Sequence, residues 1–369
     1  MGRISSYDGC NIEYPNRLAY AGMPAIVKIS NGGEYIGAGL TIKVNDDYYT
    51  EVRTLYNGET TFDISRYMQL AFEGKPFEFD FGTREQVQKS NLAQDVSVVV
   101  QITEENGTSV TALQFDVKAL FGYIAYGQSN GGVRYRKLFA NYPQTFDFYL
   151  DLGTELSITA NGKETLIQLP LEIKDLEQVS IELSRWWAVP GDAKTAELYA
   201  DDTSYLNGGD VVEGEGEYRL TIDRSKSGVF LRWLDHFGQW CYYLLRPTGS
   251  NYTTKEVRTW QNSELRDSVA PTNGVVQSGD HLQQQLSQQQ TITLGAKLVD
   301  AEIFDFLLSL IASSRVEMLV NAEEYHKDNS TQPIWERVNV VAGSYARTGA
   351  PLQDFIISIA KTANQSQIL

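Results

Sequence analysis

Short runs of apolar and β-branched residues, separated by turn residues, recur along most of the chain and predict antiparallel strands. In the first part of the chain the turn residues include Asn45, next to two aspartates, and Gly107, after an asparagine. Each of these turns joins two strand patterns, so two hairpins are expected there. The predicted strands are 24–29, 35–44, 48–55, 95–103 and 109–118. Together they indicate an antiparallel unit of sandwich size.

The clearest pattern of the middle part is an aromatic hairpin at residues 229–245. Two apolar and aromatic strands meet at the segment His236-Phe-Gly-Gln, where Gly238 supplies the positive φ that a tight reversal needs. Further strands are expected at 145–149, 155–160, 164–169, 178–183 and 217–222. The middle part is therefore predicted to be all-β.

The last part carries the one pattern that strongly predicts a helix, over residues 300–313. Asp300 is placed to cap the helix, and its apolar residues fall on a single face. These residues are Ile303, Phe306, Leu307, Leu310 and Ile311. Strands are expected at 315–320, 335–341 and 354–360, while the glutamine-rich stretch 282–290 fits either a loop or an extended polar strand edge. A further helical turn or two is predicted at 66–72, with Ser65 as its N-cap.

These patterns predict a mostly-β protein of two or three β-sandwich-like domains, with one helix packed on a sheet in the C-terminal domain. The predicted division is an N-terminal sandwich at 1–119, a central all-β domain with the aromatic hairpin at 120–250, and a C-terminal α+β or sandwich domain at 251–369. A chain of 369 residues is long enough for that number of domains.

Composition excludes some classes of function. Apolar residues make up 42% of the chain, so extensive disorder is excluded. The net charge of −16 repels polyphosphates, so we expect no nucleic-acid partner. No apolar stretch approaches the length of a membrane helix and no signal peptide is visible, so no membrane insertion is expected and the chain is predicted to stay soluble in the cytoplasm. Cys10 and Cys241 leave room for one long-range disulfide at most.

One motif suggests an enzyme, a G-x-S-x-G match around Ser129. A serine hydrolase of this kind needs a strand before the serine and a helix after it, and residues 132–139 have an extended pattern instead. The three histidines, His236, His281 and His326, lack an aspartate three residues earlier and lack metal-ligand spacing. We therefore expect no enzyme, no cofactor and no metal site, and retain a Ser129 esterase as a weak alternative.

The aromatic residues of the middle part have two competing interpretations. Indole and phenol rings stack on apolar sugar faces, which favours a carbohydrate-binding platform. The same residues are equally common in sandwich cores and subunit interfaces, and the seven-residue spacing of Trp233 and Trp240 fits cross-strand packing in one hairpin. The candidates for an interface or a sugar platform are Trp186, Trp187, Trp233, Trp240, Tyr242 and Tyr243. The structural interpretation is favoured, and the carbohydrate-binding one stays open.

The aromatic hairpin at 230–245 resembles a hairpin of tail-tip proteins encoded by bacteriophages and prophages of gut Bacteroidetes. The order of the C-terminal segments, a helix at 301–311 and strands at 316–320, 335–340 and 355–359, is similar to tail-tube-derived and distal-tail modules. The resemblance implies a structural subunit of a siphophage-type tail tip or baseplate, hexameric or trimeric, that forms a ring and contacts tail-tube and tail-hub proteins. It also implies a place in the virion, after assembly in the host cytoplasm. Completion of strand edges by neighbouring subunits is physically consistent with this role. The alternative is a receptor-binding protein that recognises a host surface glycan.

Overall fold

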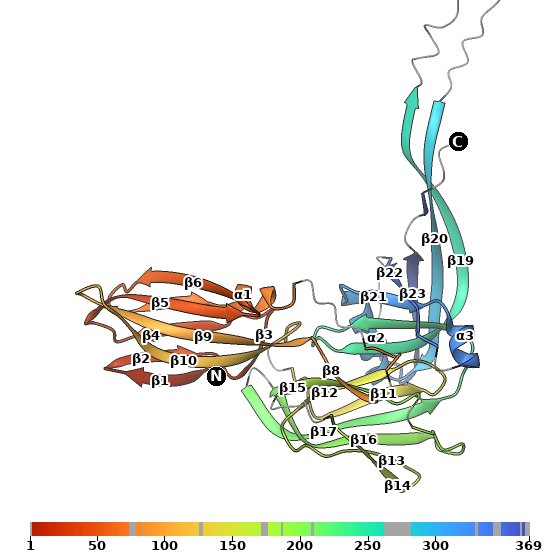
Figure 1. The fold of residues 1–369 in the computed structure, drawn as a ribbon. Helices are drawn as coiled ribbons and strands as arrows, with labels where there is room; N and C mark the ends of the chain where they lie inside the picture. Colours follow the sequence, from red (N-terminus) through yellow and green to blue (C-terminus); the bar gives the residue numbers. More distant parts are fainter. Residues whose placement is uncertain are drawn as a thin grey trace, which may run out of the picture.

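A computed structural model describes residues 2–73, 79–83, 85–124, 128–170, 176–185, 187–207, 210–261, 282–328, 331–341, 348–361 and 364–365, with only the backbone described for 251–261, 282–290 and 364–365. The described chain is mostly β, in four sheets with three short or medium helices, which confirms the predicted fold class. Figure 1 shows an N-terminal sandwich beside a larger body, from which two long strands extend.

The N-terminal sandwich consists of a four-stranded and a five-stranded sheet. The first contains β1 (Arg3–Tyr7), β2 (Cys10–Tyr14), β4 (Ile26–Ser30) and β7 (Thr60–Asp63). The second contains, in spatial order, β3 (Leu18–Tyr20), β10 (Ser109–Leu120), β9 (Ala93–Glu104), β5 (Tyr35–Val44) and β6 (Asp47–Thr54). Alternate residues of the strands point inward, so Ile12, Ile29, Leu40 and Val98 are fully buried. Both predicted hairpins, β5–β6 and β9–β10, are confirmed.

The short helix α1 (Ser65–Leu70) begins at Ser65 itself, one residue earlier than a Ser65 cap would allow. Ile64 occupies the N-cap position, and no side chain caps the helix there. The Asp63 carboxylate instead accepts hydrogen bonds from the backbone N–H groups of Ser65, at 3.0 Å, and Ala25, at 3.2 Å. The expectation for Ser65 was wrong because the residue before the N-cap has a carboxylate that reaches both amides.

The middle sheet contains eight strands, one of which comes from the segment between β7 and β9 of the N-terminal sandwich. They are β8 (Val87–Lys89), β11 (Val133–Phe139), β12 (Thr145–Leu150), β13 (Leu156–Ala160), β14 (Lys163–Ile167), β15 (Glu177–Glu182), β16 (Thr195–Asn207) and β17 (Asp210–Asp223). The edge strand β11 pairs with β17 in parallel, although the other pairings in this sheet are antiparallel.

The last sheet closes on itself. Its strands are β18 (Val229–Leu234), β19 (Trp240–Gln261), β20 (Leu282–Val299), β21 (Val316–Leu319), β22 (Trp335–Val340), β23 (Gln353–Lys361) and β24 (Asn364–Gln365). Because β19 pairs with both β18 and β20, six strands form a closed ring without a free edge. The aromatic hairpin, which the sequence groups with residues 120–250, is thus hydrogen-bonded into the sheet that holds residues 282–361.

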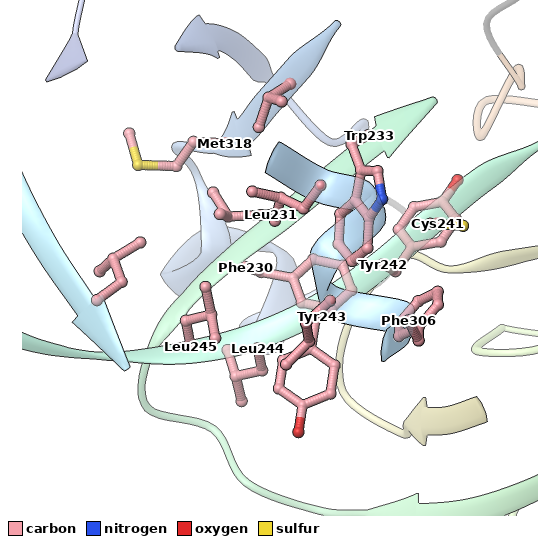
Figure 2. Close-up of a cluster of buried hydrophobic side chains, with 14 of the residues drawn as sticks. Phe230, Leu231, Trp233, Cys241, Tyr242, Tyr243, Leu244, Leu245, Phe306 and Met318 are labelled. Carbon is pink, nitrogen blue, oxygen red and sulfur yellow. The ribbon is translucent and has the colours of Figure 1, made fainter. Parts of the chain in front are cut away.

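The helix α2 (Ala301–Ala312) has the predicted cap and apolar face. The Asp300 carboxylate accepts a hydrogen bond from the Ile303 N–H at 2.8 Å. The helix contacts the hairpin through Trp233, whose indole N–H donates to the Ser309 hydroxyl at 2.9 Å, and Figure 2 shows Trp233 beside Phe306 in the surrounding core. A second short helix of this region, α3 (Ala322–Lys327), follows β21.

Candidate functional site

The turn of the aromatic hairpin, residues 235–239, is where three parts of the fold meet. The sequence makes this turn locally, because the Asp235 carboxylate accepts from the backbone N–H groups of Phe237 and Gln239, both at 3.0 Å. Gly238 has a φ of 70°, as the sequence predicts. A Cβ at Gly238 would lie 2.0 Å from the backbone oxygen of Phe121. The segment that leaves the N-terminal sandwich after β10 therefore passes directly against the turn.

Backbone carbonyls of the turn accept hydrogen bonds from both neighbouring parts. The Phe237 oxygen accepts from the hydroxyl of Tyr20, in the N-terminal sandwich, at 3.3 Å and from that of Tyr149, in the middle sheet, at 3.2 Å. The Gly238 oxygen accepts from the Gln178 side chain at 3.1 Å. The His236 oxygen accepts from the Tyr123 N–H at 2.7 Å. These bonds tie the turn to both other parts of the molecule.

Beyond the turn, the hairpin is joined to the middle sheet by buried polar groups. The Asp147 carboxylate accepts from the Trp240 N–H at 2.9 Å and from the Ser180 hydroxyl at 2.6 Å. Arg134 donates to the Gln239 side chain at 3.0 Å, and its guanidinium lies 3.8 Å from the ring centre of Tyr218. Every one of these partners is buried or half-buried, so water competes little for the bonds.

The low polarity of this junction changes the acidity of its titratable groups. Burial raises the pKa of Asp147 to about 6, against the hydrogen bonds from Ser180 and Trp240, which lower it. Burial likewise raises the pKa of Asp235 and of the Cys241 thiol, and the Asp235 charge raises that of Cys241 further. These groups form hydrogen bonds that hold backbone and neighbouring side chains, which is the pattern of a structural junction.

A second contact between the N-terminal sandwich and the middle sheet is a nearly buried ion pair. Glu177 accepts from Lys89 at 2.7 Å, and its carboxylate lies 3.6 Å from the Lys118 ammonium. Lys118 also lies 2.8 Å from Asp95 in its own sandwich. Breaking one member of such a buried group leaves an uncompensated charge, so the contact resists separation of the two parts.

The middle and last parts share one apolar core. The rings of Tyr142 and Phe230 stack with centres 4.5 Å apart, and Phe139 meets Tyr243 edge-on at 5.4 Å. The hydroxyls of Thr145 and Tyr242 are hydrogen-bonded at 2.8 Å. Figure 2 shows Phe230, Tyr242 and Tyr243 gathered in this core.

The structure places the candidate aromatic residues inside the molecule. Trp233 is fully buried, and Trp187, Trp240, Tyr242 and Tyr243 are each less than a tenth exposed. Trp187 lies in the core of the middle sheet, whereas the other four lie in the core of the last. Trp186 lies outside the described residues. The five described rings offer no face to a sugar or to another subunit, so their position agrees with the structural interpretation of packing in a core.

Ser129 does not have the surroundings of a hydrolase nucleophile. It is exposed, and its hydroxyl accepts a hydrogen bond from the Gly131 N–H at 3.3 Å. A strand, β11, follows the loop in place of the helix that a nucleophile elbow requires. Cys10 and Cys241 are free thiols in separate cores, so they do not form a disulfide.

Two further surveys cover the described part of the chain. No group of three or more histidine, cysteine, aspartate or glutamate side chains is placed there to hold a metal ion. None of the described helices is long and apolar enough to cross a membrane. A cleft of about 310 Å³ lies beside the turn, lined among others by Gln69, Phe72, Tyr123, His236 and Ser313.

Comparison with known proteins gives only remote structural likenesses. No family model and no curated protein matches the chain. Among solved structures, the chain is similar to the periplasmic chaperone SfaE, with 12% identity and a TM-score of 0.20 over 58% of this chain and 100% of that one. Fibronectin(III)-like modules of Clostridium thermocellum CbhA match with 10% identity and a TM-score of 0.18 over 61% and 95%. Extracellular domains 3–5 of Drosophila OTK match with 8% identity and a TM-score of 0.18 over 78% and 93%. Likenesses with TM-scores this low carry no argument about function.

Proposed function

We propose that this chain is a non-catalytic structural subunit of a phage tail tip or baseplate, which assembles with copies of itself into a symmetric ring. The observation that carries the proposal is the extension of β19 and β20 beyond the rest of their sheet (Figure 1). We define the arm as residues 251–261 of β19 and 282–290 of β20. Within the described chain, the arm strands pair with each other, and only the two residues of β24 join them.

A free two-stranded ribbon of this kind is marginally stable in water. The eleven residues of the β19 half reach about 35 Å from the sheet at roughly 3.3 Å per residue. Since only the two residues of β24 pair with the arm within the described chain, docking on another molecule would add to its stability. An arm that docks on an identical neighbour, while the body of the subunit receives the arm of the next one, generates a closed ring.

The junction around residues 235–239 supports the same role. A ring closes only if each subunit holds its two contact surfaces at a fixed angle. The hydrogen bonds to the turn, the buried carboxylate of Asp147 and the ion pair of Glu177 and Lys118 join the three parts at several points. A rigid body with an extended arm is a suitable building block for such an assembly.

The remaining features are compatible with a virion component assembled in a host cytoplasm. The net charge of −16 keeps unassembled copies apart until local contacts form. Tail-tube and tail-hub proteins are the proposed neighbours in the particle, in line with the resemblance of the hairpin and the C-terminal segments. The buried positions of the described candidate aromatics remove the observation that favoured a glycan-binding alternative.

The test compares the full chain with an armless variant, in which an Asn-Gly turn replaces residues 252–290 and joins the paired residues Asn251 and Thr291. Native mass spectrometry and negative-stain imaging are expected to give closed rings for the full chain and smaller species for the variant. Circular dichroism and thermal unfolding control for loss of the fold. Monomers of the full chain at every concentration, or unchanged rings of the armless variant, would contradict the proposal.

A further inference from the structure

The strand β6 is an open sheet edge of the N-terminal sandwich. It is the outermost strand of its sheet and has eight residues, compared with five in β1 and four in β7, which are the edges of the facing sheet. Its pairing with β5 is regular over all eight residues, without a bulge, and it contains no proline. Edge strands are ordinarily protected by such devices, because an unprotected edge pairs with other chains.

The register of the β5–β6 hairpin determines which backbone groups of β6 face outward. The Leu55 N–H donates to the Ile36 oxygen at 3.1 Å, so odd-numbered residues of β6 direct their N–H and C=O groups toward β5. Tyr48, Thr50 and Val52 therefore direct theirs away from the sheet. No described group of the chain accepts from or donates to these outward amides and carbonyls.

The side chains on the outer face of β6 are unusually apolar for a solvent-exposed edge. Tyr48 is 67% exposed and Val52 is 71% exposed. Asp47 and Arg53, near the two ends of the strand, are also exposed and carry opposite charges. The strand thus has free backbone groups, apolar side chains and a charge at each end.

We propose that β6 pairs with β6 of a second copy of this chain, antiparallel and across a twofold axis at Thr50. The sequence of the strand is self-complementary in this register. Tyr48 of each copy faces Val52 of the other, which gives two aromatic–β-branched pairs, and each Asp47 faces an Arg53 of the other copy. The outward amides of Tyr48, Thr50 and Val52 then meet outward carbonyls, because each even-numbered residue faces an even-numbered residue of the other copy in this register.

The neighbouring registers are less favourable. A shift of the axis to Glu51 keeps even-numbered residues opposite even-numbered ones, but it places two glutamates directly opposite each other. A shift to Tyr49 places Asp47 of each copy opposite Glu51 of the other, which again opposes two like charges. The charges therefore select Thr50, and the paired sheets would form one continuous ten-stranded sheet.

This contact is independent of the arm. A twofold contact is complete with two copies, so it joins two subunits or two rings and does not itself generate a ring of higher symmetry. The armless variant therefore retains the β6 contact, whereas variants of β6 retain ring formation through the arm. Failure of one proposal is thus distinguishable from failure of the other.

The first experiment is a cysteine cross-link. Directly opposed residues of a hydrogen-bonded antiparallel pair have Cα atoms about 5.5 Å apart, within the span of a disulfide. Thr50→Cys in the armless variant is expected to give a covalent dimer under mild oxidation. Thr165→Cys, at an exposed position of the edge strand β14, is the matched control and is expected to stay monomeric on a denaturing gel. An equal yield of dimer from both variants, or none from Thr50→Cys, overturns the proposal.

The second experiment breaks the contact without breaking the sandwich. Thr50→Pro removes an outward N–H and no bond to β5, and edge strands accept proline at such positions. Val52→Lys puts a charge at an apolar position of the contact. Asp47→Arg replaces the opposite charges of Asp47 and Arg53 by two like charges. Asp46→Arg, in the adjacent turn, is the charge-matched control for Asp47→Arg. Sedimentation equilibrium of the armless chain is expected to show a dimer that each of the three variants weakens by about tenfold or more, and that the control leaves unchanged. A monomeric armless chain, or a dimer that none of the three variants weakens, overturns the proposal.

Discussion

The Asp147 carboxylate and the backbone N–H of Trp240 are joined by a buried hydrogen bond of 2.9 Å. This bond connects β12 of the middle sheet to the start of β19, one residue beyond the 235–239 turn. It places an ionisable group where the middle and last parts of the fold meet. The pH dependence of the junction follows from it.

The Asp147→Asn variant is expected to lose less stability than the natural chain as the pH rises from acidic to neutral. Burial raises the pKa of Asp147 from its ordinary value of 3.8 to about 6, so the folded chain binds the proton more tightly than the unfolded chain. The group therefore stabilises the fold below pH 3.8, and this stabilisation is lost as the pH rises through about 6. An asparagine keeps both contacts, because its oxygen accepts from Trp240 and its amide donates to the Ser180 hydroxyl.

The measurement is the free energy of unfolding in urea between pH 4 and pH 8. The stability of Asp147→Asn relative to the natural chain is expected to increase by about 2.5 kcal/mol over that range, because the shift is worth roughly 1.4 kcal/mol per pKa unit and a small part of it falls below pH 4. The control Asp192→Asn, at an exposed carboxylate, separates this effect from the loss of one negative charge. A stability difference that does not change with pH would contradict the structural account of Asp147.

Gly238→Ala is expected to destabilise the protein more than Gly162→Ala. Both glycines have a positive φ, 70° and 73°, so a side chain costs about 1–2 kcal/mol of backbone strain at either position. Only at Gly238 does the new Cβ meet another segment, the Phe121 oxygen at 2.0 Å, whereas nothing lies within 4 Å at Gly162. Moving these backbones apart costs a further 1–3 kcal/mol, approximately. Equal midpoints of thermal unfolding for the two variants would show that the turn does not press against residue 121.

Asp63→Ala is expected to cost about 1–2 kcal/mol of stability, and Ser65→Ala close to nothing. The Asp63 carboxylate accepts from the amides of Ser65 and Ala25, whereas the Ser65 side chain caps nothing. Urea denaturation of the two variants measures the difference. The reverse order of stabilities would restore Ser65 as the helix cap.

The two thiols of the native chain are expected to react slowly with a thiol reagent such as DTNB. Burial raises the pKa of both Cys10 and Cys241, so little of the reactive thiolate forms near pH 8. Unfolding in guanidinium should release two reactive thiols per chain, because no disulfide joins them. A rapid reaction of the folded protein would contradict the buried positions. The slow background reaction also makes the Thr50→Cys cross-link specific.

The 235–239 turn shows which part of the site the sequence could predict. An aspartate followed three residues later by glycine, between two apolar strands, is a local signal for the turn and for the positive φ of Gly238. The hydroxyls of Tyr20 and Tyr149 and the amide of Gln178 were missed, because nothing near them in sequence indicates a common target. The only available signal was that these three side chains carry a polar end within otherwise apolar strands.

The sequence by itself determined the strands, the hairpins and the capped helix α2, because side-chain periodicity, turn sterics and capping act between residues a few positions apart. The aromatic hairpin at 229–245 was part of that local information. Only the tertiary structure decided that the rings of this hairpin lie in a shared core and that β19 closes the last sheet by pairing with β20. It also decided that the Asp147 carboxylate accepts a hydrogen bond from the Trp240 N–H. These outcomes depend on how distant segments bury apolar surface and satisfy buried polar groups together, which no local pattern specifies.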